Sequence, residues 1–153
     1  MTFRILHGDL FHSAAQTLSN PINCHGVMGG GLAMEFRLRF PIMFRDYVQR
    51  CHRGEVRVGM PYVWHNFSGG PSVLNFPTKD DWEDPSKLEY VEEGPRYLVE
   101  HYREMGIASL ALPALGCGLG GLEWRDVQPM MEQELSRLDI SVEIWSLKGL
   151  LEP

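Results

Sequence analysis

Apolar and polar residues alternate along the chain in short segments that predict strands. These segments are residues 2–7, 17–24, 62–64, 72–76, 107–112 and 140–145. Pro21 weakens the middle of the second segment, because proline has no N–H for a sheet ladder. Residues 107–112 form a short apolar run with Ser109 as its one polar residue, which favours a strand buried on both faces.

Apolar positions recur at helical spacing between the strands. The predicted helices cover residues 32–40, 42–53, 86–105 and 124–135. Pro41 separates the first two, since proline breaks a helix interior. Ser86 and Glu89 match a capping box that opens the third helix, and Gly94 and Pro95 are expected to kink or divide it.

This alternation of strands and helices predicts an α/β fold. The turn at residues 68–71 joins two strands directly, so we expect a mixed, largely parallel sheet. The chain has 153 residues, of which 44% are hydrophobic. That size and composition fit one compact domain, residues 1–153, and leave little room for a second.

Net charge and the distribution of arginines indicate which kinds of partner the protein can bind. The net charge of −6 argues against a protein that coats nucleic acid through general electrostatics. Six arginines nevertheless gather between Arg37 and Arg57. The solvated face of one or two helices is the favoured interpretation, and a patch that faces a polyanion is the alternative.

Cysteine usage and motif content argue against metal and membrane roles. Cys24, Cys51 and Cys117 are widely spaced and form no CxxC pair, which fits a reducing cytoplasm better than a disulfide framework or a zinc site. No HExxH motif or carboxylate cluster occurs, so neither a metal nor another cofactor is expected. The first residues lack a long apolar run, so we expect no signal peptide and no membrane span.

Two glycine-rich loops, residues 26–31 and 116–121, each lie between a predicted strand and a predicted helix. Glycine lets backbone N–H groups approach an anion, and a following helix N-terminus favours phosphate. Two such loops at one sheet edge can hold the two phosphates of a diphosphate. The alternative is that the glycines only permit tight turns, and for two loops we favour anion binding.

Common nucleotide-binding motifs fit the second loop poorly. No GxxxxGK[ST] occurs, so a P-loop is unsupported. Gly116, Gly118 and Gly121 match GxGxxG, but that fingerprint normally opens a domain and precedes a strand that ends in a carboxylate. Here it lies near the C-terminus, and Asp139 precedes the next strand. NAD-dependent hydride transfer is therefore not favoured.

Four segments together resemble the macrodomain family over nearly the whole chain. Residues 20–33 (NPINCHGVMGGGLA) are similar to its N-x-x-N-x-x-G-x-M-G-x-G segment, and residues 112–124 (LPALGCGLGGLEW) to its second phosphate loop. Residues 7–10 (HGDL) resemble the turn near its adenine pocket. Residues 75–82 (NFPTKDDW) resemble the N-F-P-T-K-x-x-W segment of one branch, the DarG-type DNA ADP-ribosyl glycohydrolases. The terminal ADP-ribose protein glycohydrolases are more distant relatives.

The resemblance implies a three-layer α/β/α macrodomain with ADP-ribose across the C-terminal ends of the strands. It implies that Lys79 carries the catalytic amine and that Asn23 lies near the distal ribose. Asp9 and Leu10 would meet adenine. The full set of implied ADP-ribose-binding residues is Asp9, Leu10, Asn23, Gly29, Gly30, Gly31, Leu32, Thr78, Gly116, Cys117, Gly118, Leu119 and Gly120.

The chemistry of Lys79 can be considered apart from the family. A neutral amine attacks the anomeric carbon of a sugar and forms a covalent intermediate that water resolves, and burial or a nearby cation favours the neutral form. Asp80 and Asp81 oppose that form unless they point into solvent, although one of them can instead carry protons. Without the resemblance, a solvated loop lysine is the more common case. Trp82 is the tryptophan that we expect near the ligand.

Three other loop positions qualify this picture. The terminal ADP-ribose protein glycohydrolases have an aspartate where this chain has Gly120, which we interpret as a difference between branches. The general acid and base therefore stay unassigned. His25 fits either a contact with phosphate or ribose, or a surface or capping role. A helix N-terminus near Cys117 would stabilise its thiolate, but no base partner is evident, so we interpret it as a small loop residue.

The predicted function is removal of ADP-ribose from ADP-ribosylated DNA. One alternative is the same chemistry on ADP-ribosylated protein, and another is a reader that binds ADP-ribose without turnover. Lys79 separates the reader from both enzymes, because binding alone does not need its amine. A DarT-like toxin is expected as a partner only if a longer chain exists. We expect a cytoplasmic monomer that does not contact membranes.

Overall fold

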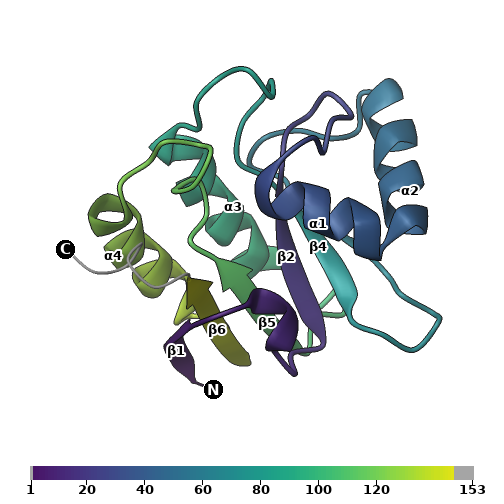
Figure 1. Cartoon of the computed structure of the whole chain (residues 1–153). Helices are drawn as coiled ribbons and strands as arrows, with labels where there is room; N and C mark the ends of the chain where they lie inside the picture. The colour runs from purple at the N-terminus through teal and green to yellow at the C-terminus, as the bar shows by residue number, and fades with distance from the viewer. Residues whose placement is uncertain (1, 147–153) are drawn as a thin grey trace.

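The computed structural model describes residues 2–146, and every strand in that range belongs to one six-stranded sheet (Figure 1). The strands are β1 (Phe3–His7), β2 (Thr17–Ile22), β3 (Tyr62–Trp64), β4 (Ser72–Pro77), β5 (Ser109–Pro113) and β6 (Ser141–Ser146). Their order across the sheet is β1-β6-β5-β2-β4-β3, and β3 alone runs antiparallel to its neighbour. This confirms the predicted mixed, largely parallel sheet.

Helices cover both faces of the sheet and give the molecule three layers (Figure 1). One face carries α1 (Gly31–Arg39) and α2 (Pro41–His52), and the other carries α3 (Leu88–His101) and α4 (Trp124–Leu135). A short 3-10 helix, η1 (Leu10–His12), follows β1. No helix within residues 2–146 has the length and apolar character needed to cross a membrane.

The pairing of β2 with β4 positions the loops that follow them. All six residues of β4 are buried, because Val73 faces the core under α1 and α2 while Leu74 and Phe76 face the core under α3 and α4. The register joins the two strands residue by residue, from Thr17↔Ser72 to Ile22↔Pro77. The chain therefore leaves both strands at the same level of the sheet.

The third helix differs from its prediction at both ends. It begins at Leu88 with Lys87 as N-cap, so Ser86 is not the capping residue, and it ends at His101. Ser86 is instead buried, and its N–H donates to the carbonyl oxygen of Gly120, 3.0 Å away. Because of this tertiary contact, Ser86 does not cap α3.

Gly94 and Pro95 do not divide α3, contrary to one of the two predicted outcomes. A Cβ on Gly94 would overlap the phenyl ring of Phe76, so this side chain of β4 packs directly on the helix backbone at that position. Packing of this kind supports the helix across the proline.

Candidate functional site

Three loops emerge together at the C-terminal edge of the parallel strands. They are the first glycine loop (23–30) after β2, the lysine loop (78–87) after β4 and the second glycine loop (114–123) after β5. Ligands of open α/β sheets bind at this edge, because the loops there are free to vary while the strands hold them in place.

Asn23 organises the first glycine loop from within. Its side-chain Nδ2 donates to the carbonyl oxygen of Val27 (2.7 Å), and its Oδ1 accepts from the N–H of His25 (2.9 Å). Gly26 has a φ of +81°, which a residue with a side chain rarely adopts. These bonds hold the loop curved and end β2 at Ile22, two residues before the predicted end.

The first loop leads directly into α1. Gly30 is the N-cap and offers no side-chain hydrogen bond, so the first N–H groups of α1 have no cap from a side chain. Gly29 is exposed and Leu32 is half-buried within the first turn of the helix. Backbone N–H groups and a helix dipole in this arrangement suit a phosphate.

The hydroxyl of Tyr47, on α2, is hydrogen-bonded to Asn23. Its Oη lies 2.8 Å from the carbonyl oxygen of Asn23 and 2.9 Å from Oδ1 of the same residue. Tyr47 is fully buried, and burial raises the pKa of its phenol, so the group stays protonated and donates. No sequence pattern pointed to this role, because Tyr47 lies on the apolar stripe of its helix.

The second glycine loop is a compact turn that contacts the first. The N–H of Leu122 donates to the carbonyl oxygen of Gly116 (2.8 Å) and closes the turn. A Cβ on Gly30 would lie 3.5 Å from Cδ1 of Leu119, and a Cβ on Gly31 would lie 3.1 Å from it. The two glycine loops, which are about 90 residues apart in sequence, thus meet at one edge as predicted.

Lys79 lies beside the first glycine loop. The N–H of Thr78, a buried residue, donates to the carbonyl oxygen of Ile22 (2.9 Å), and the N–H of Cys24 donates to the carbonyl oxygen of Asp80 (2.8 Å). These two bonds hold the start of the lysine loop along residues 22–24, where β2 ends and the first glycine loop begins. The lysine is half-buried, and its Nζ lies 3.4 Å from the carbonyl oxygen of Trp82.

The carboxylates next to Lys79 turn away from it. Oδ1 of Asp80 lies 3.5 Å from Nε2 of His25, and Oδ1 of Asp81 accepts from the N–H of Glu83 (3.3 Å). Within residues 2–146, neither carboxylate lies within ion-pair distance of Nζ of Lys79. Both carboxylates therefore have partners other than the amine of Lys79.

The second glycine loop is also joined to the lysine loop. Besides the bond from Ser86 to Gly120, a Cβ on Gly120 would overlap Oγ of Ser86 and would lie 2.6 Å from the carbonyl oxygen of Gly116. No side chain fits there unless the loop moves. The structure therefore explains why this chain has glycine, and no acid, at that position.

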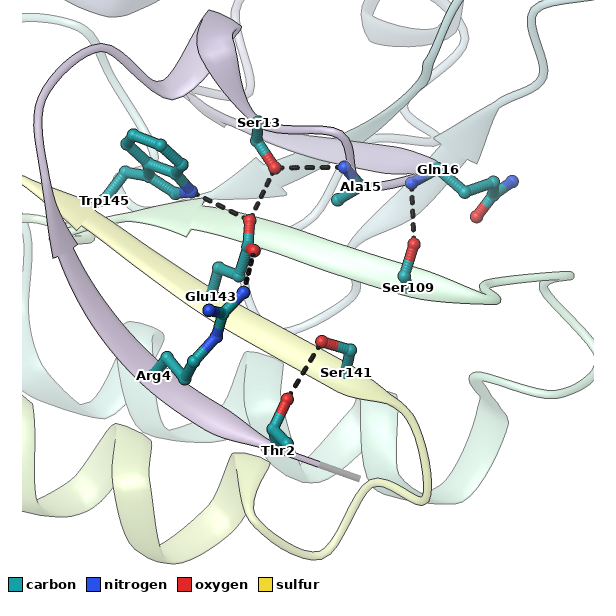
Figure 2. Close-up of polar contacts among 9 residues, drawn as sticks. All are labelled: Thr2, Arg4, Ser13, Ala15, Gln16, Ser109, Ser141, Glu143 and Trp145. Atoms are coloured by element: carbon teal, nitrogen blue, oxygen red, sulfur yellow. Dashed lines mark hydrogen bonds and ion pairs between the residues drawn. The ribbon is translucent and has the colours of Figure 1, made fainter.

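The turn after β1 is anchored through Glu143 (Figure 2). Gly8 packs on the indole of Trp145, and Oδ1 of Asp9 accepts from the N–H of Phe11 (2.9 Å) at the start of η1. Leu10 is buried in the core. Of the two residues expected near adenine, Asp9 is therefore the one that reaches the surface.

Glu143 of β6 accepts three hydrogen bonds. They come from Oγ of Ser13 (2.6 Å), from Nη2 of Arg4 (2.8 Å) and from Nε1 of Trp145 (3.0 Å). Burial raises the pKa of this carboxyl, but the three donors outweigh burial and leave the pKa below its usual range. The charged form of Glu143 therefore holds the segment after β1 on the sheet.

The thiol of Cys117 is free and buried. It is buried, seven residues before α4 begins, and its Sγ points to the carbonyl oxygen of Leu115 (3.5 Å). Burial raises its pKa to about 11, with a further contribution from Glu123 and Asp126. The idea that a helix N-terminus stabilises its thiolate was wrong, and its interpretation as a small loop residue is favoured.

Within residues 2–146, no group of three or more His, Cys, Asp or Glu side chains gathers in a way that suits a metal ion. The loops instead offer backbone N–H groups, the amines of Lys79 and Lys87 and the amide of Asn23, which are groups that bind an organic diphosphate.

Comparison with known proteins assigns this arrangement to a family. A sequence profile described as Macro domain matches residues 19–131, so the chain belongs to the macrodomain family. The DNA ADP-ribosyl glycohydrolase of Mycobacterium tuberculosis is 41% identical over 145 residues, which cover 93% of this chain and 41% of that protein. The chain thus spans about two fifths of the length of such relatives.

Solved structures agree with this assignment. The macrodomain of Mycobacterium tuberculosis DarG superposes with a TM-score of 0.87 at 42% identity and covers 92% of this chain and 96% of that one. The structure of Thermosipho africanus DarTG in complex with ADP-ribose has a TM-score of 0.91 at 40% identity, over 95% of this chain and 42% of that one. The recognised branch of the family is therefore confirmed.

Proposed function

We propose that this chain is an ADP-ribosyl glycohydrolase that removes ADP-ribose from modified DNA. The observation that carries the proposal is the meeting of both glycine loops with the lysine loop, which contains Lys79, at one sheet edge. Relatives at 39–41% identity that are named DNA ADP-ribosyl glycohydrolase support the same activity. Thermosipho africanus DarTG, solved in complex with ADP-ribose, adds support for ADP-ribose as the ligand.

In this proposal, ADP-ribose lies across the three loops. The diphosphate contacts the backbone N–H groups of the two glycine loops, adenine lies toward Asp9, and the distal ribose lies between Asn23 and Lys79. The assigned ligand contacts are Asp9, Leu10, Asn23, Gly29, Gly30, Gly31, Leu32, Thr78, Gly116, Cys117, Gly118, Leu119 and Gly120. The exposed members of this set are Gly29, Gly31, Gly118 and Leu119, whereas Leu10, Asn23, Thr78, Gly116, Cys117 and Gly120 are buried.

The chemistry proceeds in two steps. The neutral amine of Lys79 forms a bond to C1 of the distal ribose as the bond from C1 to the DNA base breaks, and the base leaves with that electron pair and takes up a proton. The ribose ring then opens to a lysine imine as the bond between C1 and the ring oxygen breaks, and the ring oxygen takes up a proton. Water adds to C1, the C–N bond breaks with its electron pair and a proton going to the amine of Lys79, and the ring closes as ADP-ribose is released. Asn23 is assigned the role of positioning the ribose and not of proton transfer, because an amide side chain does not titrate.

The test places the candidate substrates side by side. ADP-ribosylated single-stranded oligonucleotide and ADP-ribosylated protein are incubated with the wild type and with Lys79→Ala, and released ADP-ribose is measured. We expect release from the oligonucleotide by the wild type only. Release from protein alone would assign the alternative substrate, and ADP-ribose binding without any release would make the chain a reader.

Cellular context is part of the same proposal. We assign the chain to the cytoplasm as a monomer. A DarT-like toxin is a partner only where a longer chain supplies the remaining region. The Thermosipho africanus relative, named a DNA ADP-ribosyl transferase–DNA ADP-ribosyl glycohydrolase fusion protein, joins both activities in one chain.

A further inference from the structure

Positive charge is concentrated in one part of this acidic protein. Residues 31–57, which include α1 and α2, hold six arginines and three carboxylates, whereas the whole chain has 14 basic and 20 acidic residues. This segment therefore carries a net charge of about +3 and the remainder about −9, which is a local field of the kind that attracts polyanions.

The exposed side of α2 contains a stripe without any carboxylate. Arg45, Gln49, His52 and Arg53, which we call the outer stripe, follow helical spacing and are all exposed. Asp46 is the one acid in α2; it lies beside Arg53 in helical spacing, at the edge of the stripe, and pairs with Arg50 at 2.8 Å. The outer stripe consequently presents donors, and carboxylates compete for them only at Arg53 among the described residues.

The guanidinium groups of the outer stripe are available. Among residues 2–146, Arg45 has no carboxylate within ion-pair distance. Arg53 pairs with Glu55 at 2.8 Å, but both side chains are about half exposed, and such pairs exchange readily for another anion. Phosphate oxygens are well matched to these donors.

The outer stripe leads to the candidate site. A Cβ on Gly26 would lie 3.9 Å from Cβ of Cys51, so the C-terminal end of α2 lies against the first glycine loop. Arg45 and His52 are seven residues apart, which separates them by about 10 Å along the helix axis. At the rise of about 3.4 Å per phosphate along one strand of duplex DNA, that distance spans roughly three phosphates.

We propose that the outer stripe of α2 binds the phosphodiester backbone of the DNA strand that carries the ADP-ribose. The inference rests on the proposed function and adds the path of the strand away from the modified base. Contacts of this kind position a nucleic acid without reading its sequence, and they weaken as salt rises. The acidic remainder of the surface keeps the strand off the other faces.

The test compares two matched charge reversals. Arg45→Glu changes the outer stripe, and Arg103→Glu changes an exposed arginine that follows α3. Binding of an unmodified, fluorescent single-stranded oligonucleotide is measured by polarisation at several salt concentrations, with ADP-ribose affinity measured by calorimetry. We expect Arg45→Glu to weaken oligonucleotide binding roughly tenfold and to reduce the slope of log K against log salt by about 0.7. Arg103→Glu should match the wild type, and ADP-ribose affinity should be unchanged in both.

Two results would overturn the inference. One is wild-type oligonucleotide affinity in Arg45→Glu, and the other is an equal loss in both variants, which would indicate net charge alone. Displacement of the oligonucleotide by polyglutamate at equal charge concentration would assign the stripe to an acidic protein instead. Failure of the wild type to release ADP-ribose from DNA is a separate result, because it refutes the hydrolase while the polarisation data still report on the stripe.

Discussion

Lys79 is the residue on which the catalytic proposal depends. Its neighbours Asp80 and Asp81 are engaged by His25 and by the backbone of Glu83, so the amine is not held in an ion pair with either. A nucleophile and a merely electrostatic cation make different demands at this position. An electrostatic role needs only the charge, whereas attack on C1 needs a lone pair.

We expect Lys79→Ala to reduce release of ADP-ribose by on the order of a thousandfold or more, with ADP-ribose affinity largely retained. Lys79→Arg should fail nearly as badly, since a guanidinium is not nucleophilic at neutral pH. Borohydride added during turnover should trap a protein–sugar adduct, detected by mass spectrometry. Retained activity in Lys79→Arg together with no adduct would refute the nucleophile.

Tyr47 acts through Asn23. In Tyr47→Phe the carbonyl oxygen of Asn23 loses its donor, so we expect unfolding free energy to fall by about 1–3 kcal/mol and kcat to fall more than ADP-ribose affinity. Tyr62→Phe is the matched control, because Tyr62 contacts Asn75 at 3.0 Å and not Asn23. A purely structural Tyr47 would leave kcat unchanged in both variants at equal stability loss.

At the scale of elements, the glycine loops depend on two kinds of glycine. A Cβ on Gly118 would meet nothing within 4 Å, whereas one on Gly120 would meet Ser86 and the backbone of Gly116. The first position is open space toward which a ligand can approach. The second is an internal contact that allows the loop to pack against the lysine loop.

Gly118→Glu should therefore fold with near wild-type melting temperature and lose ADP-ribose affinity, because its side chain and charge occupy the diphosphate position. Gly120→Ala should lower the melting temperature, since the loop has to shift. Thermal unfolding and calorimetry on both variants check the pair. Wild-type ADP-ribose affinity in folded Gly118→Glu would show that the second loop is only a turn.

Local sequence patterns were sufficient for the elements but not for the contacts between them. The order of strands and helices follows from periodicity and turn residues, and the two glycine loops follow from composition and placement. The bond from Ser86 to Gly120 and that from Tyr47 to Asn23 join residues 34 and 24 positions apart. Neither hydrogen bond can be predicted from the residues next to it in sequence. Because Ser86 bonds to Gly120, α3 begins at Leu88 and not at the predicted capping box.

At the scale of the whole molecule, Glu143 links the chain start to the sheet. Its three donors come from β1, from the segment after η1 and from β6 itself (Figure 2). Because its pKa is lower in the folded than in the unfolded protein, its contribution is complete above the unfolded pKa, about 4.3, and is lost as pH falls through the folded pKa.

Glu143→Gln should lower unfolding free energy at pH 7 by about 1–3 kcal/mol, because an amide replaces one acceptor with a donor that faces other donors. The difference from the wild type should shrink as pH falls below about 4, where the wild-type carboxyl becomes protonated. Urea unfolding between pH 3 and pH 7 measures it. A difference that stays constant over that range would show that the charge of Glu143 is not what stabilises the fold.

The hydrogen bonds that join the three loops have a consequence for how such a domain diversifies. All three run between main-chain atoms: from Thr78 to Ile22, from Cys24 to Asp80 and from Ser86 to Gly120. Main-chain bonds do not depend on which side chain a residue carries. Exposed loop positions such as Trp82 and Glu83 are therefore free to be randomised in a library while the loops keep their places. A protein engineer could alter the preferred acceptor of the ADP-ribose at these positions without redesigning the scaffold.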